Sequence, residues 1–167
     1  RDFWVLDSAD YAGLVTTGED GLIPYAPLEE VTGPRVELNA STPAFRRMNA
    51  SASVSRSRAP IFAEGSRGDI TAASASLSLR PHESVRLSLS NTYQRITRAR
   101  DGSEYARTMI PRVRMEVQPT RAFFMRAIAE YRTERAAAPL DARTGAPLLR
   151  DGEPLTGYTV DGLRVDL

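Results

Sequence analysis

The sequence contains no cysteine, which excludes disulfide bonds, thiolate metal sites, a cysteine nucleophile and CxxC redox chemistry within the chain. It contains a single histidine, His82, so a site with several histidine ligands is excluded as well. Lysine is missing too, and all 22 basic side chains are arginine. There is no Gly-x-Ser-x-Gly elbow and no phosphate-binding glycine loop. The sequence therefore predicts no metal site, no cofactor and no catalytic residue, and it favours a non-catalytic role.

A strong charge of one sign and a long apolar run are also lacking. The 22 basic and 21 acidic residues leave a net charge of +1, which argues against nucleic acid as a partner. No stretch approaches the ~20 apolar residues of a membrane-spanning helix. Hydrophobic residues make up 41% of the 167 residues, but many are alanine, so a soluble domain built from them would have a thin core.

Three prolines at equal intervals, Pro43, Pro81 and Pro119, punctuate the middle of the chain. Apolar and polar residues alternate on both sides of each proline, which is typical of strands with one apolar and one polar face. Proline suits the turn because it cannot donate to a ladder. The alternation predicts at least three hairpins with strands of roughly 10–14 residues, long against the usual ~5–6. The alternating segments are residues 35–41, 48–55, 72–79, 85–93, 109–118 and 123–132.

The two ends of the chain differ from this middle part. Residues 1–34 are predicted to be an irregular N-terminal segment with a long polar loop, and residues 35–167 an antiparallel up-and-down meander of about seven strands. Longer polar links are expected at residues 62–69, 98–103 and 136–162. A new alternation begins at Leu163 and stops at Leu167, so we expect a truncated last strand and a fragment of a longer protein.

Two architectures explain long alternating antiparallel strands: an outer-membrane barrel with its apolar face on lipid, and a soluble β-sandwich with that face on a second sheet. Strand length, tight turns and a polar face rich in serine and threonine favour the barrel. Against it, Asn91 and Arg107 fall on the apolar face, and Pro111 predicts a bulge inside a strand. Aromatic residues near the strand ends also suit a membrane interface: Phe45, Phe62, Tyr93, Tyr105, Phe123 and Tyr131.

Three stretches resemble a known but uncharacterised bacterial family: residues 95–108 (RITRARDGSEYART), 110–126 (IPRVRMEVQPTRAFFMR) and 140–149 (LDARTGAPLL). The family is an outer-membrane-type C-terminal β-barrel domain, usually fused to an N-terminal carbohydrate-binding-like β-sandwich. The resemblance covers most of residues 34–167. It implies a partial outer-membrane β-barrel, located in the cell outer membrane of a Gram-negative-type bacterium. The chain lacks the sandwich domain and the last barrel strands, so the resemblance implies a glycan partner only through a domain absent from this chain.

A ladder of charges around Pro119 is the most ordered polar feature. If Pro119 pairs with Phe123 across a three-residue turn, Glu116 lies opposite Arg126, and Arg112 lies opposite Glu130. This register is favoured because opposite charges directly across a ladder stabilise it, whereas the alternative sets two arginines against each other. The four residues are interpreted as a charged lumen lining or as structural ion pairs inside a closed barrel: Arg112, Glu116, Arg126 and Glu130.

Other charged residues carry weaker predictions. His82 is interpreted as a solvated turn residue. The acidic loops at residues 19–21, 101–104 and 151–153 lack the spacing of a calcium loop and are interpreted as turns. Arginines near one loop are either a solvated rim or contacts for lipopolysaccharide headgroups: Arg95, Arg98, Arg100 and Arg107.

The resulting functional prediction is a non-catalytic outer-membrane β-barrel segment of unknown substrate. It would act as a membrane anchor or pore for a larger surface or periplasmic protein, with the lipid bilayer and lipopolysaccharide as partners. The alternatives are a soluble β-sandwich carbohydrate-binding module and a part of a carbohydrate-active hydrolase.

Overall fold

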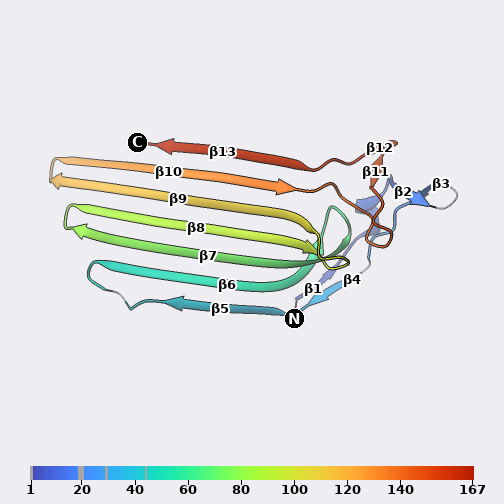
Figure 1. The fold of residues 1–167 in the computed structure, drawn as a ribbon, viewed down its shortest axis with the longest axis horizontal. Coiled ribbons are helices and arrows are strands. Elements are labelled where there is room, and N and C mark those ends of the chain that lie inside the picture. The colour runs from blue at the N-terminus through green and yellow to red at the C-terminus, as the bar shows by residue number, and fades with distance from the viewer. Residues whose placement is uncertain (1, 19–20, 29, 44) are drawn as a thin grey trace.

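The computed structural model describes residues 2–18, 21–28, 30–43 and 45–167, and these form an all-β chain with antiparallel sheets. Within these ranges the one helical turn is the 3₁₀ segment η1 (Ser8–Tyr11). Two parts are visible in Figure 1: a sheet of long strands, and a small lobe at the end of that sheet opposite the tight turns. Across the described residues, no helix is long and apolar enough to cross a membrane.

The long sheet has seven strands in the order β13-β10-β9-β8-β7-β6-β5, all antiparallel to their neighbours. From β5 to β10 every strand pairs with the next one in the chain, so the predicted antiparallel meander of long strands is confirmed. The strands are β5 (Arg35–Ser41), β6 (Met48–Ile61), β7 (Ser66–His82), β8 (Val85–Arg98), β9 (Glu104–Thr120), β10 (Phe123–Ala136) and β13 (Tyr158–Asp166).

The predicted turns form, although their details differ from the prediction. Pro81 and Pro119 lie inside the ends of β7 and β9, and the turns follow them at residues 83–84 and 121–122. Phe123 pairs with Thr120 rather than with Pro119, so the expected three-residue turn was wrong. An irregularity before Met125 then brings the strands into the expected register, with Arg126 opposite Glu116.

The links between hairpins also differ from those expected. The turn after β6 spans only residues 62–65, since the chain re-enters the sheet at Ser66. Strand β13 begins at Tyr158, inside the segment expected to be a loop. Pro111 pairs with Asn91 without a register shift, so the predicted bulge was wrong. The shift between β8 and β9 lies instead at residues 96–97, near the lobe.

The sheet has one apolar face and one polar face, as the alternation predicts. Across the middle of the apolar face Leu77 lies opposite Leu89, which lies opposite Val113. The polar face carries the intervening residues, and the hydroxyls of its serines meet across β6 and β7: Ser51 and Ser76 at 2.7 Å, and Ser53 and Ser74 at 2.8 Å. Neighbouring strands therefore place their apolar side chains on the same face of the sheet and their polar side chains on the other.

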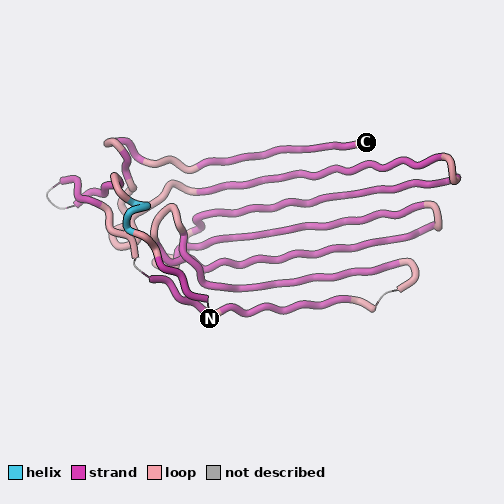
Figure 2. Tube along the Cα trace, turned by 180° about the vertical axis from the view of Figure 1, so that it is seen from behind, coloured by secondary structure: helices cyan, strands magenta, loops and turns pink. Residues whose placement is uncertain are grey.

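No described segment covers the apolar face of the long sheet. Leu38 is 71% exposed, and Leu163 is 70% exposed. Large apolar side chains are exposed along the whole sheet: Val36, Leu38, Met48, Val54, Met109, Val113, Met115, Met125, Leu163 and Val165. Figures 1 and 2 show a single layer of strands from the front and from behind. The second sheet that a β-sandwich requires over this face is not among the described residues.

The lobe is where the buried core lies. Strand β1 (Asp2–Val5) pairs with β4 (Glu30–Gly33), and β2 (Leu14–Gly18) joins β3 (Gly21–Pro24), β11 (Leu149–Arg150) and β12 (Glu153–Pro154) in a four-stranded sheet. The lobe core is Leu6, Tyr11, Leu14, Tyr25, Val31 and Leu148.

The lobe corrects the expectation for both ends of the chain. Most of the first 33 residues form short strands rather than an irregular loop, and residues 137–157 leave the meander to join them. Strands of two to five residues are too short to show a period of two in the sequence.

Candidate functional site

The predicted charge ladder lies on the polar face of β9 and β10. Arg112 is opposite Glu130, and their charged atoms are 3.8 Å apart. Glu116 is opposite Arg126 in the register, but its carboxylate contacts Arg114 and, at 3.6 Å, Arg86 on β8. The ladder thus extends across β8, β9 and β10. Its place in a lumen remains a prediction.

The charges of this polar face are partly exposed. The side chains of Arg112 and Glu130 are 48% and 36% exposed, so their ion pair contributes no more than ~1 kcal/mol. On β6 and β7 the same face carries serine hydroxyls instead of charges. Where it carries these serines and charges, the face is suited to contact with water, hydroxylated solutes or ions.

The apolar face carries a band of uncharged side chains that ends at arginines. On β9 the band runs from Val117 to Met109, and the next residue on this face is Arg107. On β8 it runs from Val85 to Tyr93 and ends at Arg95 in the same way. Both arginines lie on the side of the lobe, so the band has a charged border there.

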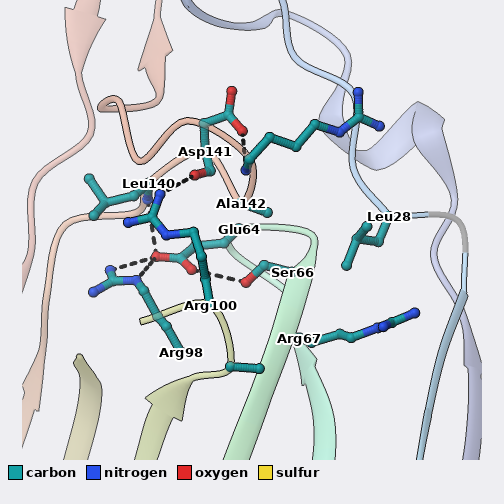
Figure 3. A pocket seen from close by; sticks show the side chains of 11 residues that line it. Leu28, Glu64, Ser66, Arg67, Arg98, Arg100, Leu140, Asp141 and Ala142 are labelled. Carbon is teal, nitrogen blue, oxygen red and sulfur yellow. Dashed lines mark hydrogen bonds and ion pairs between the residues drawn. The ribbon is translucent and has the colours of Figure 1, made fainter. Parts of the chain in front are cut away.

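A buried ion pair joins the lobe to the sheet. Arg98 donates from Nε and Nη2 to Oε1 of Glu64 at 2.8 and 2.6 Å, and the two side chains are 8% and 1% exposed. Ser66 donates to Oε2 of Glu64 at 3.0 Å, and the backbone N–H of Leu140 donates to Oε1 at 3.0 Å. Figure 3 shows these groups converging on the Glu64 carboxylate. A single carboxylate thus ties together the β6–β7 turn, β8 and the segment after β10.

Further contacts extend this junction. Arg98 also donates to the Ala138 carbonyl at 2.8 Å and to Ser103 at 3.2 Å, and its guanidinium lies 5.3 Å from the ring centre of Tyr105. The Tyr25 hydroxyl donates to the Glu64 carbonyl, which brings in the N-terminal segment. Burial raises the pKa of Tyr25 to about 12. The hydroxyl therefore stays protonated and keeps donating at all physiological pH values.

A cavity of about 260 Å³ lies beside this ion pair, lined by Leu28, Arg67, Arg98, Arg100, Leu140 and Asp141 among others. Most of its charged groups already have partners. Asp141 accepts backbone N–H groups of its own turn, and Arg100 pairs with Asp101 at 2.7 Å. The Ser103 hydroxyl and the Arg100 guanidinium hold the pKa of the Asp101 carboxyl well below its usual range. The arrangement serves to hold the lobe against the sheet.

The arginines predicted to form one loop rim lie in two different environments in the structure. Arg98 is buried, and Arg100 packs against Gly145, where a Cβ would lie within 3 Å of the guanidinium. Arg95 and Arg107 lie on the apolar face, both within 3 Å of Glu104. The loop-rim interpretation was therefore wrong for Arg98, because Glu64 draws its side chain into the lobe junction.

The remaining sequence-based candidates form no cluster. His82 Nδ1 lies 2.7 Å from the Ser84 hydroxyl in an exposed turn. Among the described residues no three histidine, aspartate or glutamate side chains are placed to hold a metal ion. Glu19 and Asp20 lie outside the described residues. Glu64 was not anticipated from the sequence, since it lies in a turn and its partners Arg98 and Leu140 are 34 and 76 residues away in the chain.

Comparison with protein-family models finds no match, and comparisons with curated proteins and with solved structures find none either. The resemblance to the outer-membrane barrel family therefore stays a prediction.

Proposed function

We propose that the chain is part of an outer-membrane β-barrel and acts, without catalysis, as a membrane anchor or pore for a larger surface or periplasmic protein. One observation carries the proposal: the apolar face of the seven-stranded sheet has no described segment over it. Exposed apolar patches of this extent on a soluble protein mark an interaction surface or a membrane contact. Every strand carries apolar side chains on this face, with Asn91 and Asp161 as polar exceptions inside the band, and such a face fits acyl chains.

The height of the apolar band supports a membrane as the partner. On β9 the band extends from Val117 to Met109, which matches the ~9–11 residues that a tilted strand needs to cross the hydrocarbon layer. A charged side chain is costly in the middle of the layer and tolerated near its border. The arginines Arg95 and Arg107 lie beyond the band, on its lobe side.

The two ends of the sheet suggest an orientation. Outer-membrane barrels have short turns on the periplasmic side and longer loops outside. Here the short turns at residues 83–84 and 121–122 lie at one end, and the lobe lies at the other (Figure 1). We therefore place the lobe on the cell surface and the turns in the periplasm.

Closure of the barrel requires further strands. The edge strands β5 and β13 both run from the lobe towards the tight turns (Figure 1), so pairing them directly would be parallel. An antiparallel barrel therefore needs an odd number of additional strands between them, which gives an even total. These strands would also pair with the backbone N–H and C=O groups at the outer edges of β5 and β13. Such groups find no hydrogen-bond partner in the hydrocarbon layer of a membrane.

Cell fractionation tests the proposal. We expect the full-length protein to sediment with outer membranes, to resist extraction by high salt, and to require detergent for solubility. The folded protein should migrate differently on gels before and after heating. Recovery of the full-length protein from the soluble fraction without detergent would contradict the proposal.

A further inference from the structure

Four arginines lie at one level on the apolar face, at the border of the apolar band. Arg95 on β8 is directly opposite Arg107 on β9, and Arg107 is directly opposite Arg135 on β10. Arg56 on β6 is on the same level, separated from Arg95 by Thr71 of β7. Like charges directly opposite each other destabilise an antiparallel sheet. Three in succession therefore indicate a counter-charge that joins them.

The described residues supply only part of that counter-charge. Glu104 pairs with Arg95 at 2.7 Å and with Arg107 at 2.6 Å. Arg135 forms no ion pair with a described residue, and the nearby Asp161 accepts a hydrogen bond from Tyr131 instead. The charge of this part of the face is therefore positive.

Asp69 lies beside Arg56, at the other end of the arginine row. Its carboxylate pairs with Arg58 at 3.0 Å and with Arg56 at 3.7 Å, so one acid is shared by two arginines there as well. Asp69 and Glu104 both pair with Thr97, which follows Arg95 on β8 in the direction of the lobe, so both acids lie on the lobe side of the arginine row. The side of the row that faces the apolar band is open to an anion.

The apolar band next to the arginines is not flat. Two residues further along each strand, at the next position on this face, Tyr93 lies opposite Met109. Beyond them is a hollow of about 270 Å³, with small or short side chains between larger ones. It is lined by Ala75, Leu77, Leu89, Asn91, Pro111 and Val113, among others. Such a hollow accepts an acyl chain lying along the sheet.

We propose that the row of Arg56, Arg95, Arg107 and Arg135 binds the phosphates of a lipid A-type glycolipid of the outer leaflet. An acyl chain of that lipid passes Tyr93 and Met109 into the hollow. The inference rests on the proposed function, since it places the row at the outer border of the membrane. Guanidinium groups bind phosphate oxygens in a bidentate way, which gives the contact its specificity.

The geometry favours a lipid with two phosphates over a soluble anion. Neighbouring strands are ~4.8 Å apart, so the three arginines on β8, β9 and β10 span about 10 Å, more than one phosphate covers. A soluble anion would neutralise the arginines but leave the adjacent apolar band in water. An amphiphilic anion satisfies both parts of the surface at once.

The test compares the full-length protein with the triple variant Arg95→Gln/Arg107→Gln/Arg135→Gln in phosphatidylcholine vesicles with and without diphosphoryl lipid A. The matched control removes three arginines elsewhere: Arg35→Gln/Arg143→Gln/Arg164→Gln. We expect wild type and control to bind lipid A at least ~100-fold more tightly than the triple variant, since a charge-assisted contact is worth about tenfold or more per arginine. All three proteins should insert into phosphatidylcholine alone.

The other outcomes separate this inference from the proposed function. Equal lipid A binding by the triple variant and wild type would overturn the inference. So would equal binding of phosphatidylglycerol and lipid A by wild type, or displacement of lipid A by millimolar inorganic phosphate. Failure of the wild-type protein to insert into any of these vesicles would instead overturn the proposed membrane function itself.

Discussion

Replacing Glu64 with alanine is expected to destabilise the lobe by about 3–5 kcal/mol, because it leaves the buried guanidinium of Arg98 without its counter-charge. The same change removes the acceptor for Ser66 and for the Leu140 N–H. The lobe should therefore detach from the sheet before the sheet itself unfolds. Hydrogen exchange of the lobe strands, followed as a function of urea, measures this effect.

Two controls make the result specific to the buried pair. Arg35→Ala breaks the exposed pair with Glu37 and should cost less than ~1 kcal/mol. The double variant Glu64→Leu/Arg98→Met removes both charges and should recover most of the stability, since an apolar pair of similar volume often replaces a buried ion pair without loss. An effect of Glu64→Ala no larger than that of Arg35→Ala would refute the role assigned to this junction.

An arginine in the middle of the apolar band is the second change with a large expected effect. Leu89→Arg should destabilise the protein folded in lipid vesicles by about 2–4 kcal/mol, the cost of this side chain at the bilayer midplane. Leu89 lies between Leu77 and Val113 in the centre of the band. Denaturant titration of the protein in vesicles measures the loss.

The two control variants place an arginine either on the polar face or near the border of the apolar band. Thr92→Arg lies on the polar face of the same strand and should cost less than ~1 kcal/mol, because that face is open to water. Val54→Arg lies on the apolar face beside the arginine row and should cost ~0–1 kcal/mol. If Leu89→Arg is tolerated as well as Thr92→Arg, the apolar face does not contact lipid.

The long sheet was predictable from the sequence because the patterns that specify it lie within single strands and hairpins. Alternation along a strand fixes which residues share a face, and Pro81 and Pro119 mark positions close to the turns. The register of β9 and β10 was predicted from opposite charges across the ladder, even though the turn itself was assigned incorrectly. Of the two expected pairs, Arg112 and Glu130 do pair, whereas Glu116 contacts Arg114 and Arg86 instead of Arg126. Pairing between strands that follow one another in the chain can therefore be predicted without the rest of the sequence.

The lobe was not predictable for the opposite reason. Its core brings Tyr11 and Val31 together with Leu148, which comes from the far end of the chain. The strands around them are too short to show a period, and Glu64 and Arg98 are separated by the whole of β7 and most of β8. Nothing in one sequence distinguishes Glu64 from an acidic residue in a solvated turn.

The absence of cysteine makes a direct test of the central claim possible, since every introduced thiol is unique in the chain. Single cysteines are placed along β8 at Leu87, Ser88, Leu89, Ser90, Asn91 and Thr92. Each is labelled with a fluorophore in the full-length protein folded in vesicles, after any cysteine outside these 167 residues has been replaced by serine. We predict that lipid-borne quenchers act on positions 87, 89 and 91, while water-soluble quenchers act on positions 88, 90 and 92. Equal access of water-soluble quenchers to all six positions would contradict a membrane contact for the apolar face.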